Sequence, residues 1–354
     1  MERKRIRELG INIGKLKPGK YNSITDVDGV IVGHKTILDK DVCSGLTVIM
    51  PGNGKLKGHH YPAGLFTFNG TGEFTGSHWI EETGTLVSPI VFTGSHLLGL
   101  AHHNLSLATR RIEYLEPCSF GVTAETWDGW LSDLEKTSIT YHDMEEAILN
   151  AKSGIVEEGN VGGGTGMICF EFKGGIGTSS RIVECDCGTY TIGVLVQTNF
   201  GRRQDLIING KNVGEIINEK QVPLPWDTPE IGGSLLVTLM TNAPLLPSQC
   251  ERVSKRASLA LAKLGAIGEE DSGDFFLTVS TGNCYKYDEE KTYPVNMFPS
   301  EQLSNIFEGA IEAVSEAIIN SMCMAETISG QKQRKVYEIP LSKLAEIYEP
   351  LLNK

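Results

Sequence analysis

The segment "PEIGGSLLVTLM", from Pro229 to Met240, sets two glycines and a serine directly before an uninterrupted apolar run. The apolar run predicts a buried β-strand. Gly-Gly-Ser in front of such a strand is ordinary turn chemistry. The same residues also fit a second interpretation, in which the Gly233–Ser234 bond is cut and Ser234 becomes a nucleophile at a new N-terminus. Residues elsewhere in the chain must decide between the two.

Strand and helix patterns alternate after Ser234. The apolar positions Val253, Ala257 and Leu264 share one face of a predicted helix. The elements expected in this part are a strand at 235–240, a helix at 249–265, a strand from residue 274, a long helix at about 301–324 and a short helix near 341–351.

The upstream part is richer in strands. Short apolar runs between residues 25 and 91 predict antiparallel strands, with Asn69-Gly70 as a turn signal. Residues 202–233 contain three prolines and mixed charge, so we expect a polar surface loop with little core of its own. Two blocks of strands with helices outside them predict a single α+β domain of packed sheets under covering helices. Further strands are expected from residues 166 and 189, and helices at 97–112 and 142–151.

Composition excludes several classes of protein. The chain has 354 residues and a net charge of −12, which argues against a nucleic-acid partner. The basic N-terminus lacks the apolar core of a signal peptide, and no apolar run reaches the roughly 18 residues of a membrane span. Eight cysteines show no framework spacing. We therefore expect a cytoplasmic protein with reduced thiols and no membrane partner.

Motifs for cofactors are absent from the sequence. The glycine-rich run "GNVGGGTGMICFEFKGGIGTSSR" (159–181) contains no G-x-x-x-x-G-K-[ST] and no G-x-G-x-x-G between a strand and a helix. Its glycines predict tight turns or a close approach of backbone to a ligand. We expect neither a metal nor an organic cofactor, because metal-site spacing is also missing from the most suggestive pairs, which are His59-His60, His102-His103 and Cys185-x-Cys187.

Four polar residues allow two interpretations each. Ser272 and Asp274, just before "FFLTV", form either a turn or a hydroxyl and a carboxylate held at the mouth of a strand. Asn199 in "TNFG" is either a turn residue or an amide donor for an oxyanion. Glu125 in "AETWDG" is either a solvated acid or a counter-ion for a substrate ammonium. Taken singly, each of them favours the structural interpretation.

Taken together, nine phrases resemble one family in its own order, from about residue 20 to about residue 325. The chain is similar to the L-aminopeptidase/D-amidase-esterases and β-peptidyl aminopeptidases, which are self-processing N-terminal-nucleophile serine hydrolases. The phrases are "SITDVDGVIVGH" (23–34), "PAGLFTFNGTGEFTG" (62–76), "AETWDG" (124–129), "GNVGGGTGM" (159–167), "FKGGIGTSSR" (172–181), "GVLVQTNFG" (193–201), "GGSLL" (232–236), "TNAPLLPSQ" (241–249) and "SGDFFLTVST" (272–281).

The resemblance implies an αββα four-layer sandwich formed jointly by two chains. The precursor is expected to cut itself between Gly233 and Ser234, giving a larger chain of residues 1–233 and a smaller chain of residues 234–354 that carries the nucleophile. Ser234 attacks first its own precursor bond and then the substrate. The resemblance also implies a homo-oligomer of these processed heterodimers.

The remaining site roles come from the same resemblance. Ser272 and Asp274 match the positions that hold and polarise the nucleophile, and Asn199 matches the oxyanion donor. Glu125 matches the acid that receives the free amino group of the substrate. Trp127 stands where many relatives carry tyrosine, which removes a hydroxyl from the expected pocket wall.

These matches predict a serine aminopeptidase that removes the amino-terminal residue from small peptides, amides or esters with a free amino group. One alternative is an acyltransferase similar to the ornithine acetyltransferases, a group that usually has threonine where Ser234 stands. The other alternative is a non-catalytic ligand-binding protein on the same scaffold. That alternative predicts a broken Ser234, Ser272 or Asp274, and all three are present.

Overall fold

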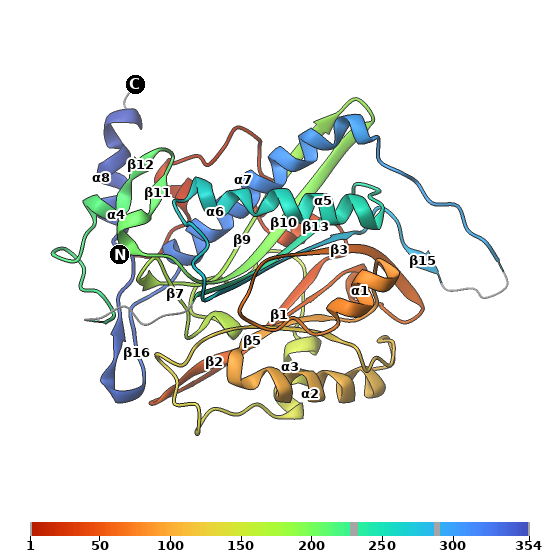
Figure 1. Ribbon diagram of the computed structural model, residues 1–354, viewed down its shortest axis with the longest axis horizontal. Coiled ribbons are helices and arrows are strands. Elements are labelled where there is room, and N and C mark those ends of the chain that lie inside the picture. The colour runs from red at the N-terminus through yellow and green to blue at the C-terminus, as the bar shows by residue number, and fades with distance from the viewer. Residues whose placement is uncertain (1, 227–232, 287–290, 353–354) are drawn as a thin grey trace.

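Two β-sheets packed face to face form the centre of the molecule, and helices cover both outer faces (Figure 1). The computed structural model describes residues 2–226, 233–286 and 291–352. In Figure 1, α5 (Pro247–Ala257), α6 (Leu259–Lys263) and α7 (Leu303–Cys323) lie along the upper side, whereas α2 (Leu98–Arg111) and α3 (Tyr141–Leu149) lie along the lower side. The order of layers is therefore helix, sheet, sheet, helix, as expected.

The larger sheet has seven strands, which come from the parts of the chain before and after Ser234. Only β13 and β14 run parallel; the other pairs are antiparallel. The order across the sheet is β15 (Tyr285–Lys286), β3 (His59–Gly70), β14 (Ser272–Ser280), β13 (Gly233–Thr241), β10 (Gly188–Asn199) and β9 (Gly175–Cys185), with β4 (Thr85–Leu86) paired to β3.

The apolar run quoted first is β13, and it is buried on both faces. Leu235, Val237 and Leu239 belong to the core shared with α5 and α7. Leu236 and Met240 belong to the second core, which lies between the sheets. Alternation of side chains along a strand explains why a continuous apolar sequence is needed at a position covered on both sides.

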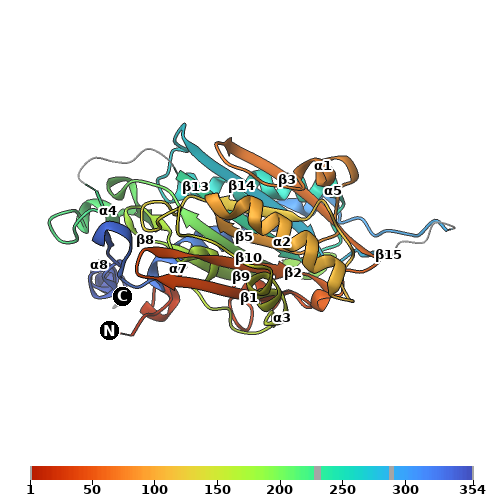
Figure 2. The same ribbon diagram turned by 90° about the horizontal axis from the view of Figure 1, so that it is seen from below.

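The smaller sheet has four strands, in the order β1 (Ile31–Asp39), β2 (Val42–Met50), β5 (Ile90–Gly94) and β6 (Val122–Thr126). Seen from below, α2 and α3 lie in front of these strands (Figure 2). The bounds of α2 and α3 confirm the two helices expected at 97–112 and 142–151.

Helix α7 crosses the outer face of β9 and β10 and is almost entirely buried. It confirms the long helix expected at 301–324. Its end lies very close to the sheet: a Cβ added at Gly177 would sit 2.0 Å from the carbonyl oxygen of Ala317. Buried ion pairs add to this packing, because the Arg181 guanidinium on β9 lies 3.1 Å from Glu312 and 2.7 Å from Glu316 on α7.

The remaining described elements are short. Three two-residue hairpins are β7 (Ile168–Cys169) with β8 (Phe172–Lys173), β11 (Ile207–Ile208) with β12 (Lys211–Asn212), and β16 (Ile328–Ser329) with β17 (Lys335–Val336). The remaining helices are α1 (Ser77–Thr83), α4 (Val213–Ile216) and α8 (Leu341–Leu352). No helix in the described ranges is long and apolar enough to cross a membrane.

Three expectations about local structure were wrong. Residues 202–226 are no bare loop, because they form β11, β12 and α4 and bury five apolar side chains, namely Leu206, Ile208, Val213, Ile217 and Val222. Residues 227–232, the rest of that expected loop, lie outside the described residues. The strand expected from Gly166 is instead the β7–β8 hairpin. Asn69 and Gly70 do not form a hairpin turn but are the last two residues of β3.

Candidate active site

The ends of three neighbouring strands bring the expected residues to one edge of the larger sheet. Strand β10 ends at Asn199, which lies opposite Ser234 at the start of β13. The parallel neighbour β14 begins beside it, so Ser272 lies opposite Gly233. Strand β13 pairs parallel to β14 and antiparallel to β10. These two pairings bring the side chains together, although they are far apart in the sequence.

Ser234 is 4% exposed, and its hydroxyl lies at the centre of this group. Its Oγ accepts a hydrogen bond from the backbone N–H of Trp127 at 3.3 Å. The Asn199 Nδ2 lies 3.5 Å from the same Oγ. On its other side, the Asn199 Oδ1 accepts a 2.9 Å bond from the backbone N–H of Ile168, so the amide nitrogen is the atom that faces Ser234.

Ser272 and Asp274 form a directly bonded pair. The Ser272 hydroxyl donates to Asp274 Oδ1 at 2.9 Å. The second carboxylate oxygen accepts a 2.9 Å bond from the Asn69 side chain at the end of β3. Burial raises the pKa of Asp274 to about 6, while these two hydrogen bonds favour its charged form. Its carboxyl group therefore titrates close to neutrality.

Asn69 is a site residue that we did not identify from the sequence. Asn-Gly is typical of hairpin turns, and that local signal conceals a contact with a strand about 200 residues away. The only other hint in the sequence is its place inside the phrase 62–76.

Glu125 lies near the end of β6 and is 8% exposed. Its carboxylate accepts hydrogen bonds from the Glu73 backbone N–H at 3.0 Å and from the Ser95 hydroxyl. Burial raises the pKa of Glu125. A Cβ added at Gly72 would sit 2.9 Å from Glu125 Oε1, so a side chain there would crowd the carboxylate.

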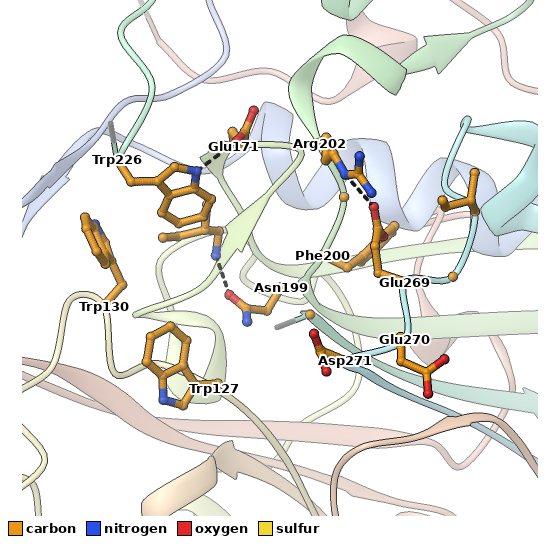
Figure 3. A pocket seen from close by; sticks show the side chains of 15 residues that line it. Trp127, Trp130, Glu171, Asn199, Phe200, Arg202, Trp226, Glu269, Glu270 and Asp271 are labelled. Carbon is orange, nitrogen blue, oxygen red and sulfur yellow. Dashed lines mark hydrogen bonds and ion pairs between the residues drawn. The ribbon is translucent and has the colours of Figure 1, made fainter. Parts of the chain in front are cut away.

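A cavity of about 530 Å³ adjoins the Gly233 side of this edge (Figure 3). Trp127, Asn199 and Gly233 line it, whereas Ser234, Ser272, Asp274 and Glu125 lie outside its described lining. The other lining residues are Trp130, Ile168, Glu171, Phe200, Gly201, Arg202, Trp226, Ile267, Gly268, Glu269, Glu270 and Asp271.

The wall of the cavity is aromatic on one side and acidic on the other (Figure 3). Trp130 and Trp226 pack edge to face with ring centroids 5.4 Å apart. The indole N–H of Trp226 donates to Glu171 Oε1 at 2.9 Å, and Arg202 pairs with Glu269 at 2.8 Å.

Neither a metal nor a phosphate has an evident place in the described residues. They contain no group of three or more His, Cys, Asp or Glu side chains that could hold a metal ion. The glycines of the 159–181 run serve packing: a Cβ at Gly163 would sit 2.2 Å from Gln197 Oε1, and one at Gly164 would sit 2.4 Å from the Ile176 nitrogen.

Comparison with known proteins gives consistent matches over nearly the whole chain. The family model of peptidase family S58 matches residues 22–336. The β-peptidyl aminopeptidase of Sphingosinicella xenopeptidilytica is 39% identical, covering 97% of this chain and 90% of that protein. A relative from Sphingosinicella microcystinivorans with the same name is 37% identical, covering 97% of this chain and 91% of its own.

Two solved structures of aminopeptidases also match nearly the whole chain. A Burkholderia sp. β-aminopeptidase superposes with a TM-score of 0.90 at 39% identity, covering 98% of this chain and 99% of its own. The L-aminopeptidase D-Ala-esterase/amidase of Ochrobactrum anthropi gives a TM-score of 0.87 at 36% identity, with 98% of each chain covered. The latter is described as a prototype for the serine aminopeptidases and a variant of the N-terminal-nucleophile hydrolase fold. These matches confirm the expected fold, and none favours the acyltransferase or the non-catalytic alternative.

Proposed function

The chain belongs to peptidase family S58 and is a serine aminopeptidase of the N-terminal-nucleophile class, and we propose that Ser234 is its nucleophile, set free when the precursor cuts its own Gly233–Ser234 bond. The observation that carries the proposal is the geometry around this one bond. Ser234 faces Asn199, and Gly233 lies opposite Ser272, which is bonded to Asp274.

In the self-cleavage step, the Ser234 Oγ attacks the carbonyl carbon of Gly233. Glycine leaves that acyl carbon uncrowded because it has no Cβ. The hydroxyl proton passes to the departing amide nitrogen, so the acyl group moves from nitrogen to oxygen. Water then hydrolyses the resulting ester. The products are a new carboxylate on Gly233 and a free α-amine on Ser234.

In the substrate reaction, the freed α-amine serves as the base. Its ordinary pKa of about 7.7–8.0 leaves a useful fraction of it neutral near physiological pH. Ser272, bonded to Asp274, is proposed to hold and relay the proton, while the Asp274 carboxylate stabilises the ammonium that forms. The Asn199 Nδ2 is the proposed donor to the tetrahedral oxyanion, a role whose loss typically costs ~10²–10³ in rate.

Substrate recognition is assigned to Glu125 and Trp127. A buried carboxylate that already accepts two hydrogen bonds is a suitable partner for a substrate ammonium. Trp127 lines the cavity, whose volume of about 530 Å³ suits small substrates. We propose that these are small peptides, amides or esters with a free amino group, hydrolysed without a cofactor.

Two further proposals rest on the sequence and the family resemblance. We propose a homo-oligomer whose subunits are each a processed pair of chains, 1–233 and 234–354. We also propose a cytoplasmic location, because the eight cysteines lack a disulfide framework.

The direct test is the intact mass of the purified protein beside its Ser234→Ala variant. Two species, 1–233 and 234–354, are expected from the wild type and one full-length species from the variant. The wild type is also expected to hydrolyse aminoacyl anilides, assayed with L-, D- and β-configured residues. A full-length wild-type chain that persists for days refutes cleavage at this bond, and Ser234 then has to be abandoned as the nucleophile.

A further inference from the structure

Lys173 carries a completely buried ammonium group in the β7–β8 hairpin, behind the candidate active site. Its Nζ donates to three backbone carbonyl oxygens, those of Gly164 at 3.2 Å, Met167 at 2.9 Å and Gly174 at 2.8 Å. Burial lowers the pKa of Lys173 to about 7, whereas its three acceptors match the three N–H groups of an ammonium and favour the charged form. Among the ion pairs of the described residues, none includes Lys173.

One of these three carbonyls belongs to the peptide unit that holds Asn199. The Met167 C=O accepts from Lys173, and the N–H of the same peptide, on Ile168, donates to Asn199 Oδ1 at 2.9 Å. The Asn199 Nδ2 in turn faces Ser234. A continuous chain of hydrogen bonds therefore runs from a buried positive charge, through one peptide and one side-chain amide, to the nucleophile (its Ile168–Asn199 link is dashed in Figure 3).

The hairpin that carries this chain is held in a conformation that few residues adopt. Phe170 and Glu171 at its tip both have positive φ, 47° and 58°, although neither is glycine. The side chain of Arg203 holds the tip, because its Nε donates to the Phe170 carbonyl at 3.2 Å and its Nη2 to the Glu171 carbonyl. Such strain persists only where the surroundings determine the backbone strongly.

We propose that Lys173 is a positioning residue for the oxyanion donor: by binding the Met167 carbonyl it fixes the Met167–Ile168 peptide and thereby the orientation of the Asn199 amide. This inference rests on the proposed function, because it gives Asn199 the oxyanion role. Two effects follow from the chain. An Asn199 amide rotated by 180° would present oxygen to the oxyanion, and the Ile168 N–H prevents that rotation. The positive charge also polarises the linked bonds, which strengthens the final donor.

The test is a double-mutant cycle with Lys173→Met and Asn199→Ala, singly and combined. Two rates are measured for each: self-cleavage, from the decay of the full-length mass in freshly purified protein, and kcat and KM of the cleaved fraction on an aminoacyl anilide. In the wild-type background, Lys173→Met is expected to lower both the cleavage rate and kcat about tenfold to a hundredfold, as a misplaced catalytic group does. KM is expected to change little. In the Asn199→Ala background, Lys173→Met is expected to have almost no further effect.

The same fold-loss in both backgrounds overturns the proposal, because it means that Lys173 acts independently of Asn199. Thr165→Val is the matched control: Thr165 lies in the same turn and bonds only to the Gly162 carbonyl at 2.6 Å, so its effect is expected to be equal in the two backgrounds. If Lys173→Met does not fold, Lys173→Gln replaces it in the cycle, since a neutral amide keeps a donor for the turn. A wild type that neither cleaves itself nor hydrolyses anilides refutes the proposed function before the cycle begins.

Discussion

Replacing Asn69 by alanine tests the electrostatics of the Ser272–Asp274 pair. The Asn69 Nδ2 donates one of the two side-chain hydrogen bonds that reach the buried Asp274 carboxylate. A hydrogen bond to a charged group contributes about 1.5–3 kcal/mol. One pKa unit corresponds to about 1.36 kcal/mol, so losing this bond is expected to raise the pKa of Asp274 by about one to two units.

The direction of the expected pH dependence follows from which protonation state of Asp274 is active. The carboxylate is the form proposed to stabilise an ammonium on Ser234, so activity is expected to fall as the pH drops through the pKa of Asp274. The α-amine of Ser234 has to be neutral to act as the base, so kcat/KM is expected to show two acid limbs in the wild type: one near the amine pKa of about 7.7–8.0, and a second, steeper one near pH 6, because burial raises the pKa of Asp274 to about 6. In Asn69→Ala the second limb is expected to move up by about one to two pH units, while the rate well above both limbs is preserved.

The assay is the pH dependence of kcat/KM on an aminoacyl anilide, measured on fully cleaved protein. Thr71→Val is the control, because Thr71 follows directly after the end of β3 and its hydroxyl donates to the Glu270 carbonyl at 3.4 Å, away from Asp274. A second limb that stays in place in Asn69→Ala, with the rate lowered equally at every pH, refutes the assignment of that limb to Asp274.

Three further substitutions have expected outcomes. Glu125→Gln is expected to raise KM for substrates with a free amino group by about tenfold to a hundredfold, since a charged hydrogen bond is lost, and to leave the rate of self-cleavage unchanged, which intact mass checks. Gly163→Ala places a Cβ 2.2 Å from Gln197 Oε1 and is expected to cost about 1–3 kcal/mol of unfolding free energy, measured by urea denaturation in the uncut Ser234→Ala background. In the same background, Arg181→Met removes the ion pair of the buried Glu312 and one of the two ion pairs of the buried Glu316, which keeps Arg7, and is expected to cost about 3–5 kcal/mol; a midpoint within error of the parent contradicts this.

The sequence predicted elements whose pattern is local. Strand β13 is a continuous apolar run and helix α7 is a long apolar segment, so both could be placed from the local sequence alone. The stretch 202–226 was misjudged because its apolar residues are spaced singly among polar ones and find a core only through contacts with other segments. Its prolines and charges are true surface signals, but they say nothing about the side chains between them.

The candidate site residues also divide into those that have a local signal in the sequence and those that have none. Ser234 stood out because Gly-Gly-Ser precedes a strand, whereas Asn69 and Lys173 carry no local signal of function. The partner of Asn69, Asp274, is 205 residues away in the sequence. Lys173 binds backbone carbonyl oxygens of a neighbouring turn, and the sequence does not indicate which backbone carbonyls act as acceptors. Such contacts become visible only when the strands are paired.

The position of β13 between β10 and β14 has a consequence for how the molecule is made. In the precursor, tethering supplies β13 to its neighbours at an effective concentration in the millimolar range. If the bond before Ser234 is cut as proposed, the same sheet spans two polypeptides, and recovering it from the unfolded state becomes a second-order reaction between them. The mature enzyme then persists because it unfolds slowly, not because it can readily reassemble. The activation barrier to unfolding then sets the lifetime of the cleaved enzyme, whose fold formed while the two chains were still one polypeptide.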